Sequence, residues 1–450
     1  MRKRAYRSTA VKQVQVSEMV NRLAEGPVWV GVDVGKLTAL TVVRDGQGHF
    51  ERPWKAEIPS EIPELVRCLQ ELARQRSLVV AMESTGTYGD ALRQALTDAG
   101  LPVHRVSGKA ASDYAEVFDG VPSAHDGKDA AVVAELAAIG KSTPLPLEPP
   151  APRQAEMNVE VIWLDTQQSI LQLWLGRLEA LLARHWPEAT RLLGLTSATL
   201  QRALAEYGGP AALAADKEAA TRLARWGGQF LKPEKIEAVL ESARQTVGVR
   251  VDEPTSRLIK RCAEQTLAAE AEIRQATRRL EAFVKQDPRL EAEAQVVGKA
   301  TACVLRVSVG DPRDYHCGEA YRKAMGLNLK ERSSGKHQGK LKITKRGPSL
   351  ARRWLYFSAM RTIQQAPVRS WYEAKRRKDQ DRGNGALVAV MRKLALALHA
   401  VATRGETFSL ERLLPGRPLP RAASCASSEQ AKRTKDSVVE KGLSPRPKAK

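Results

Sequence analysis

The 450-residue sequence predicts an α/β domain with a mixed sheet, followed by a mainly helical remainder. Three observations support this fold class. Residues 28–140 alternate short β-branched runs with amphipathic helical stretches. Residues 154–290 carry apolar residues at i, i+3 and i+4 spacing, which is typical of long helices. The Pro-rich stretch between them, residues 141–154, has the composition of a linker.

The first strands lie close together in the chain and are joined by short turns, so we expect them to pair antiparallel. The later strands are separated by helices, as in parallel crossovers. The expected strands are Val28–Val32, Ala39–Val43, a weaker Phe50–Ile58, Leu78–Met82 and Pro102–Val106. The expected helices are Glu61–Gln75, Tyr88–Ala99, Lys109–Val117 and Lys128–Ile139.

Composition shifts divide the chain into six parts. Two long amphipathic stretches in the helical middle are expected to pair as an antiparallel coiled coil, with a small helical insert at residues 207–230. After residue 415 the chain is rich in Pro, Ser and Lys, with almost no large apolar residues, which predicts disorder. The predicted parts are a flexible basic arm (1–20), the α/β domain (21–140), the linker (141–154), the helical region (155–290), a second compact domain (291–415) and a disordered basic tail (416–450).

The composition favours an intracellular protein with a polyanionic partner. The formal net charge is +21, and 43% of residues are hydrophobic, which is enough for a sizeable core. No basic amphipathic helix with a bulky apolar face is evident, so nucleic acid is favoured over a membrane surface. No apolar run reaches the roughly 18 residues of a membrane span, and the N-terminus lacks a signal-peptide core. The five scattered cysteines form no CxxC and are expected to be reduced thiols.

Carboxylates follow two of the predicted strands and begin one predicted helix. Asp33 ends "VWVGVD", Glu83 ends "LVVAME", and Asp126 and Asp129 lie three residues apart in "HDGKDA". Strand ends of this kind meet at one crevice, and residues at i and i+3 share a helix face. Four carboxylates so close need a cation, and oxygen ligands suit Mg²⁺ or Mn²⁺. A pair of such ions can clamp both oxygens of a phosphodiester exchange.

Simpler roles exist for three of the four acids. Asp126 would serve as a helix N-cap, Asp129 as a first-turn acid that complements the helix dipole, and Glu83 as a cap of the following turn. The stretch "GVDVGKLT" also resembles the first phosphate loop of the sugar-kinase and actin-like ATPases. That fold needs a second, similar half with another Gly-rich loop, which the helical residues 155–290 do not offer.

A basic segment of the second half contains a candidate nucleophile. Between Asn328 and Arg353 there are nine Lys and Arg and one acid, with Ser333, Ser334 and Gly335 among them. A solvated DNA-binding loop would have this composition. The same composition also suits a site in which a serine is the nucleophile and the cations stabilise charge at phosphorus. The candidate phosphate-binding residues are Lys336, Lys340, Lys342, Lys345, Arg346, Arg352 and Arg353.

The order Asp, Glu, Asp-x-x-Asp resembles the RuvC-like branch of the RNase H-like fold, and residues 103–136 resemble the end of the nuclease domain of the DEDD-type insertion-sequence transposases. The motif of that family is Lys-Thr-Asp-x-x-Asp-Ala. This chain has "AHDGKDA", which keeps Asp126, Asp129 and Ala130 but has His125 before the first acid and no Lys at Ala124. The departure affects a contact to a phosphate or a carboxylate and leaves the metal-binding acids in place.

The second half resembles the C-terminal domain of the same transposases. That domain has Gly-Leu, Ser-Gly, a basic spacer, Ile-x-Lys-x-Gly and a helix with Arg. Ala300 replaces the second Gly of the family's Gly-x-Gly turn, and Leu329 stands at its usual Pro. The matching residues are Gly298, Gly326-Leu327, Ser334-Gly335, Ile343, Lys345, Gly347, Arg352/Arg353 and the closing helix Asn384–Val401.

The resemblance implies a function and a set of partners. The serine before Gly is taken as catalytic in the family, which assigns that role to Ser334, with Ser333 as the alternative. It implies DNA recombination through a transient phosphoserine link, with Asp33, Glu83, Asp126 and Asp129 holding Mg²⁺ beside that serine. It further implies a homo-oligomer (dimer or tetramer), in which the acidic domain of one subunit completes the serine site of another. A structured noncoding guide RNA, and a bacterial cytoplasmic, nucleoid-associated location, are also implied. The competing hypotheses are a metal-dependent junction nuclease without a covalent intermediate and a degenerate element protein that binds nucleic acid without catalysis.

Overall fold

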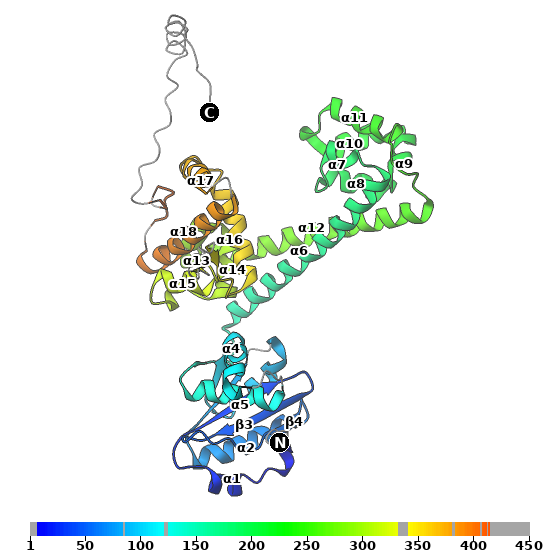
Figure 1. Cartoon of the computed structure of the whole chain (residues 1–450). Helices are drawn as coiled ribbons and strands as arrows, with labels where there is room; N and C mark the ends of the chain where they lie inside the picture. Colours follow the sequence, from blue (N-terminus) through cyan, green and yellow to red (C-terminus); the bar gives the residue numbers. More distant parts are fainter. Residues whose placement is uncertain are drawn as a thin grey trace, which may run out of the picture. The chain divides into compact units, whose positions relative to one another are not determined.

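The computed structural model describes residues 7–83, 86–120, 125–331, 341–379, 383–405, 407–411 and 413–414. The chain divides into two compact units, Met1–Pro150 and Ala151–Lys450. Figure 1 shows the mixed sheet with its helices in the first unit and an almost entirely helical second unit. The tail predicted to be disordered, residues 416–450, lies outside the described residues.

The first unit is built on a seven-stranded sheet in the order β1-β4-β3-β2-β5-β6-β7. β2 pairs antiparallel with β3, which pairs antiparallel with β4, whereas β2–β5 and β5–β6 are parallel. This order, with three antiparallel strands at one side and parallel strands at the other, is the RNase H-like arrangement predicted from the sequence. The strands are β1 (Thr9–Ala10), β2 (Val28–Val34), β3 (Thr38–Arg44), β4 (Trp54–Glu57), β5 (Leu78–Glu83), β6 (Val103–Val106) and β7 (Ser142–Pro144).

Helices cover both faces of this sheet (Figure 1). On one face Val28, Val30 and Val32 of β2 are buried with residues from α1 (Val16–Arg22), α2 (Ile62–Gln75) and α3 (Asp90–Asp98). On the other face Ala81 and Val106 pack against α4 (Gly108–Asp119) and α5 (Asp126–Ala138). β2 is apolar on both faces because helices cover both, as in the central strands of α/β sheets.

The structure corrects two boundaries at the ends of this unit. Residues 7–20 are folded rather than a flexible arm, because Val11, Val16 and Met19 insert into the core and β1 pairs with β4. Part of the predicted linker is also ordered, since Ser142–Pro144 forms β7 and pairs antiparallel with β6. The next helix begins at Pro152, a residue type favoured in the first turn.

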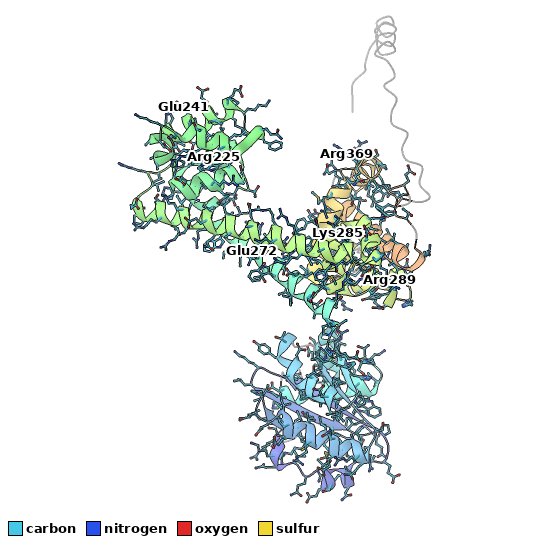
Figure 2. The ribbon with its side chains drawn as sticks, turned by 180° about the vertical axis from the view of Figure 1, so that it is seen from behind. Arg225, Glu241, Glu272, Lys285, Arg289 and Arg369 are labelled. Atoms are coloured by element: carbon cyan, nitrogen blue, oxygen red, sulfur yellow. The ribbon has the colours of Figure 1, made fainter. Side chains whose placement is uncertain are left out.

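Two long helices form the axis of the second unit, α6 (Pro152–His185) and α12 (Glu253–Lys285). They pack antiparallel along their length, with Arg279 Nε 2.8 Å from Glu160 Oε1. Glu272, labelled in Figure 2, accepts a hydrogen bond of 3.0 Å from the Trp163 indole. The predicted pairing of these helices is present; a coiled-coil supercoil stays a prediction.

The turn of this helix pair carries a helical lobe with its own core around Leu200, Leu204 and Leu223. The other end packs into a larger core with the C-terminal helices. Ile343 of the antiparallel ladder formed by β8 (Leu329–Lys330) and β9 (Lys342–Ile343) packs against this core. The lobe helices are α7 (Ala189–Leu193), α8 (Ala198–Tyr207), α9 (Pro210–Ala215), α10 (Ala219–Gly227) and α11 (Pro233–Arg244). The C-terminal helices are α13 (Pro288–Val297), α14 (Lys299–Val309), α15 (Gly318–Ala324), α16 (Ser349–Thr362), α17 (Ala366–Lys378) and α18 (Gly383–Arg404).

Among the described helices, α18 has the length and apolar composition of a membrane span, which differs from the sequence-based expectation. Leu387, Val390, Leu394 and Leu398 of α18 are buried in the core of the second unit, so the composition of α18 is explained by its place there. The four described cysteines are free thiols, as expected.

Candidate metal centre and serine segment

Asp33 and Glu83 lie at the carboxyl ends of neighbouring parallel strands. Val32 of β2 is paired with Met82 of β5, so the next residue in each strand is an acid at the same level of the sheet. The Asp33 side chain is half-buried at this edge. The sequence-based expectation that these two strands end together is confirmed by this register.

Helix α5 reaches this edge because β2 contains a glycine. A Cβ atom at Gly31 would overlap the backbone oxygen of Ala130 and lie 2.5 Å from the backbone nitrogen of Ala134. The helix backbone therefore rests directly on the strand, a close approach that only glycine permits. This contact holds the first turn of α5 beside the end of β2.

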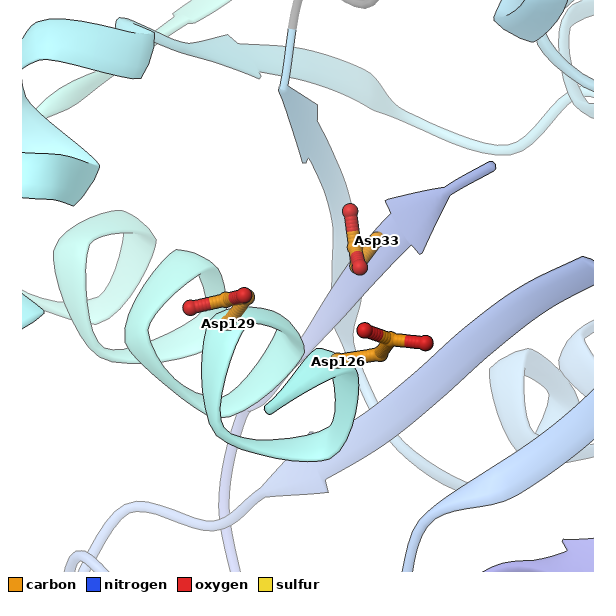
Figure 3. Close-up of side chains that lie close together, drawn as sticks. All are labelled: Asp33, Asp126 and Asp129. Atoms are coloured by element: carbon orange, nitrogen blue, oxygen red, sulfur yellow. The ribbon is translucent and has the colours of Figure 1, made fainter. Parts of the chain in front are cut away.

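Asp126 and Asp129 of that first turn lie next to Asp33 (Figure 3). One carboxylate oxygen from each of the three residues lies within 4.8 Å of those of the other two. Oxygen donors of this kind suit a hard divalent cation such as Mg²⁺ or Mn²⁺. The residues present therefore fit the predicted metal, and the identity of the ion stays a prediction.

Glu83 lies beside this group of three but is not one of its members. Its side chain occupies the space next to Gly108 at the start of α4, where a Cβ atom would lie 3.0 Å from the Glu83 carboxyl carbon. Burial and the charge of Asp129 raise the pKa of Glu83. The four acids are thus electrostatically coupled, and three of them are close enough to share one ion.

The cluster is electrostatically strained without a cation. Burial, followed by the charges of Asp129, Asp126 and Glu83, raises the pKa of Asp33 to about 6. Burial and Asp126 likewise raise the pKa of Asp129, against the opposing effects of Lys128 and His125. A divalent ion would offset this repulsion and favour the ionised carboxylates.

His125 begins α5 in the position that the transposase motif gives to Thr. Its Nδ1 accepts a hydrogen bond of 3.1 Å from the Gly127 backbone nitrogen, which is the usual role of an N-cap side chain. The predicted N-cap at Asp126 is therefore corrected: the cap is His125. Asp126 is left with its carboxylate in the acidic cluster.

Sequence reasoning missed two ion pairs that hold α5 in place. Lys128 is 1% exposed, and its Nζ lies 2.7 Å from Asp119 Oδ1 at the end of α4. Arg44 Nε of β3 lies 2.6 Å from Glu135 Oε2 of α5. The first pair could have been found from the sequence, because a Lys lies between two acids at the start of a buried helix. The second pair joins residues 91 positions apart, and no local pattern predicts it.

The candidate nucleophiles Ser334 and Ser333, with Lys336 and Lys340, lie outside the described residues. The described residues on either side are paired, because Leu329 lies opposite Ile343 and Lys330 opposite Lys342. The described residues that flank the serine segment (residues 331–341) thus form a two-stranded ladder in the second unit.

Gly326 and Gly347, two glycines of the predicted motif, allow the segments before and after this ladder to cross in close backbone contact. A Cβ at Gly326 (φ 72°) would lie 2.8 Å from the Arg346 nitrogen, and one at Gly347 (φ 156°) would lie 2.8 Å from the Gly326 nitrogen. Arg352 Nη1 donates to the Gly347 oxygen at 2.6 Å and the Met325 oxygen at 3.3 Å. Arg352, which is itself a residue of the motif, thus holds the two crossing segments together through these hydrogen bonds.

The predicted phosphate-binding residues fall into two groups in the described part of the chain. Lys342, Lys345 and Arg346 are exposed. Arg352 is half-buried in the crossing, and Arg353 forms an ion pair with Asp165 of α6. Contact with nucleic acid stays a prediction for all five.

Family comparisons agree with both motif sets. Residues 30–162 match the family profile "Transposase" for DEDD-type IS110 proteins, and residues 292–373 match "Transposase IS116/IS110/IS902 family". The two matched regions contain the acidic cluster and the serine segment, respectively.

Curated relatives and solved structures give further matches. The chain is 25% identical over 400 residues to "Insertion element IS110 uncharacterized 43.6 kDa protein" of Streptomyces coelicolor, covering 86% of this chain and 97% of that protein. It is 27% identical over 128 residues to "Probable family 20 transposase" of Pseudomonas aeruginosa, covering 28% of this chain and 38% of that one.

Two structures of Thermus thermophilus RuvC also match, each covering 26% of this chain and 99% of that chain. One is in complex with a Holliday junction substrate (17% identity, TM-score 0.22); the other is RuvC alone (18% identity, TM-score 0.21). With the RNase H-like sheet, its clustered acids and both transposase profiles in their expected order, the chain is similar to the DEDD-type insertion-sequence transposases in both motif-bearing regions, which supports a DNA transposase.

Proposed function

We propose that this transposase cuts and rejoins DNA through a serine nucleophile, Ser334, that works with a divalent metal held by Asp33, Asp126 and Asp129, with Glu83 beside them. The observation that carries the proposal is the cluster of three carboxylates within 4.8 Å at the end of β2. The match of the serine segment to the second transposase profile supports the role of Ser334.

In the proposed reaction the Ser334 hydroxyl oxygen bonds to the phosphorus of the scissile phosphodiester, and the bond from phosphorus to one sugar oxygen breaks. The serine proton passes to a base at the acidic site, and the leaving sugar oxygen takes up a proton. A sugar hydroxyl of the second DNA strand then attacks the phosphoserine, which reverses these changes and frees the serine. A bound Mg²⁺ would supply charge neutralisation at phosphorus.

The partners of the proposed reaction are DNA, an element-encoded guide RNA and other copies of this chain. The charge distribution supports a polyanion at the second unit. Residues 291–414 contain 25 Lys and Arg against 11 Asp and Glu, whereas residues 1–150 contain 18 against 19. The guide RNA and the homo-oligomer rest on the family resemblance.

The alternative is a metal-dependent junction endonuclease in which water replaces Ser334 as the nucleophile. The acidic cluster favours this reading to the same degree, because clustered carboxylates with a metal suffice for phosphodiester hydrolysis.

A covalent trap separates the two readings. Full-length protein is incubated with end-labelled element-junction DNA, Mg²⁺ and the flanking transcript, then denatured and resolved by electrophoresis. We expect label that migrates with the protein, lost in Ser334→Ala and retained in Ser333→Ala. Cleaved DNA without any adduct would establish the hydrolytic alternative. Asp33→Asn should abolish both adduct and cleavage; normal recombination by this variant would contradict a role for the acidic cluster.

A further inference from the structure

One face of α16 is apolar, aromatic and exposed. Tyr356, Phe357 and Met360 are 38%, 47% and 38% exposed, respectively. Their spacing, with Arg353 one turn earlier, places them on a single side of the helix. The two rings lie with centroids 5.9 Å apart and their planes at 74°. We call Tyr356, Phe357 and Met360 the α16 face.

The core of the second unit does not need these side chains. The opposite side of α16 is packed by Ala351, Leu355 and Ala359, which are fully buried. Ser358, 2% exposed, further fixes the helix by donating to the Val297 oxygen at 2.6 Å. The rings are thus presented on a rigid support, and exposed apolar clusters of this kind mark interaction sites.

The surroundings of the α16 face are strongly basic. Residues 341–372 contain seven Lys and Arg and no Asp or Glu. Arg353 precedes the face, and Arg361 follows it with its guanidinium held 3.1 Å from the Val297 oxygen. Arg353 forms an ion pair with Asp165 of α6. Aromatic rings set among cations form the usual surface for single-stranded nucleic acid, where bases stack and phosphates are neutralised.

The position of α16 relates this surface to the serine segment. Arg352, on the first turn of α16, donates to the backbone at Gly347, which directly follows the basic motif after β9. The α16 face begins four residues later, roughly 6 Å along the helix axis. Ile343 of β9 packs against the same core as α16, so the α16 face belongs to the same folded body as the ladder that flanks the serine segment.

We propose that the α16 face is a stacking platform for unpaired bases of the DNA strand that is processed at the serine segment. The proposal rests on the proposed function for its location, and on the exposed rings and the acid-free basic segment for its ligand. Stacking on an aromatic ring contributes about 1–3 kcal/mol per base, a factor of about 5–150 in affinity.

Binding of a labelled single-stranded dT15 oligonucleotide to the full-length protein tests the proposal, by fluorescence anisotropy without Mg²⁺. We expect Tyr356→Ala/Phe357→Ala to raise the Kd at least about 5-fold with an unchanged salt dependence, because no charge is removed. Tyr356→Phe/Phe357→Tyr, which keeps both rings, should restore binding. Phe230→Ala, which removes an 87% exposed ring from the distant lobe, is the matched control and should leave the Kd unchanged.

Three outcomes would overturn the proposal: an unchanged Kd for the double alanine variant, a loss confined to RNA of the same sequence, or a loss that accompanies a changed oligomeric mass in light scattering. The last would assign the α16 face to a protein contact. Since this assay involves no strand cleavage, a failure of Ser334 in the covalent trap leaves it interpretable, and the two failures are distinguishable.

Discussion

Gly31 positions the acidic site from outside it, by letting α5 approach β2 closely. No side chain fits between β2 and the backbone of α5, since even a Cβ atom would overlap the Ala130 oxygen. The spacing between Asp33 and the first turn of α5 therefore depends on a residue with no functional group. Activity at such a site is sensitive to displacements of a fraction of an ångström.

Gly31→Ala should displace α5 and separate the carboxylates. We expect a loss of about 1–3 kcal/mol in the free energy of unfolding, typical of overpacking, and a loss of Mn²⁺ binding. Thermal unfolding and titration calorimetry measure the two effects. Gly46→Ala is a control in the same unit, because the nearest atom to its Cβ would be 3.9 Å away. Unchanged Mn²⁺ affinity in Gly31→Ala would contradict this account.

Asp33 makes the stability of the metal-free protein depend on pH. Its pKa is raised from 3.8 to about 6, so the folded state holds this proton more tightly than the unfolded chain. The resulting stabilisation is full below pH 4 and is lost as the pH rises through about 6. Asp33→Asn should raise the melting temperature at pH 7.5 in EDTA, by an amount equivalent to about 1 kcal/mol because water screens this half-exposed site.

The measurement is thermal unfolding between pH 4 and 8, with EDTA or with Mg²⁺. Mg²⁺ should stabilise the wild type above pH 6 and have little effect on Asp33→Asn. If the variant kept the wild-type pH profile in EDTA, the repulsion assigned to Asp33 would be wrong.

At the scale of elements, α5 is held between a strand and a helix by ion pairs. The Lys128 ammonium is almost fully buried and meets Asp119 of α4, while Arg44 of β3 meets Glu135 about two turns further along α5. Arg44 also lies over the Trp29 ring, with its guanidinium carbon 5.6 Å from the centroid. The direction of α5 across the sheet is thus set at both ends.

Lys128→Met should destabilise the first unit, because Asp119 loses a charge partner in a part-buried position. We expect a loss of about 1–3 kcal/mol, below the range for fully buried pairs since Asp119 retains contact with water. A double-mutant cycle with Asp119→Asn, read from urea midpoints, isolates the pair. A coupling energy near zero would show that the two side chains contribute independently.

The sequence predicted strands correctly where the local hydrophobic pattern and the tertiary packing favour the same structure. The strands Val28–Val34, Thr38–Arg44 and Leu78–Glu83 appear close to the expected bounds, because β-branched runs between turn residues suit only buried strands here. The prediction of a flexible arm for the first 20 residues was wrong for the described part of that segment. It was based on their basic composition and did not consider Val11, Val16 and Met19, which are buried in the core.

At the scale of the whole molecule, the acidic chemistry and the positive charge reside in different units. The acids cluster in the first unit, whose charges nearly balance, while the excess of Lys and Arg lies in the second. Affinity for nucleic acid should therefore depend mainly on the second unit, with a strong dependence on salt.

Lys345→Ala/Arg346→Ala should weaken DNA binding and reduce the slope of log K against log salt by about 2, one for each exposed cation removed. Arg67→Ala/Arg74→Ala on α2 of the first unit is the matched pair and should leave the slope unchanged. The salt slopes of both double variants are measured by fluorescence anisotropy of labelled duplex DNA at roughly 50 to 200 mM salt. Equal slopes for the two variants would place the contacts elsewhere.

The sequence by itself determined the fold class and the sequence of antiparallel and parallel strand pairs in the first unit, and it named the candidate acids, because hydrophobic periodicity and turn residues act locally. It also carried the resemblance to the insertion-sequence transposases, since two sets of motifs occur in the expected order. What it could not determine was that three of four acids form one group while Glu83 turns toward Gly108, or that Arg352 fastens a chain crossing. Those outcomes depend on contacts between residues far apart in the chain, and only the packing of α5 on Gly31, α4 on α5 and Gly326 on Gly347 decided them.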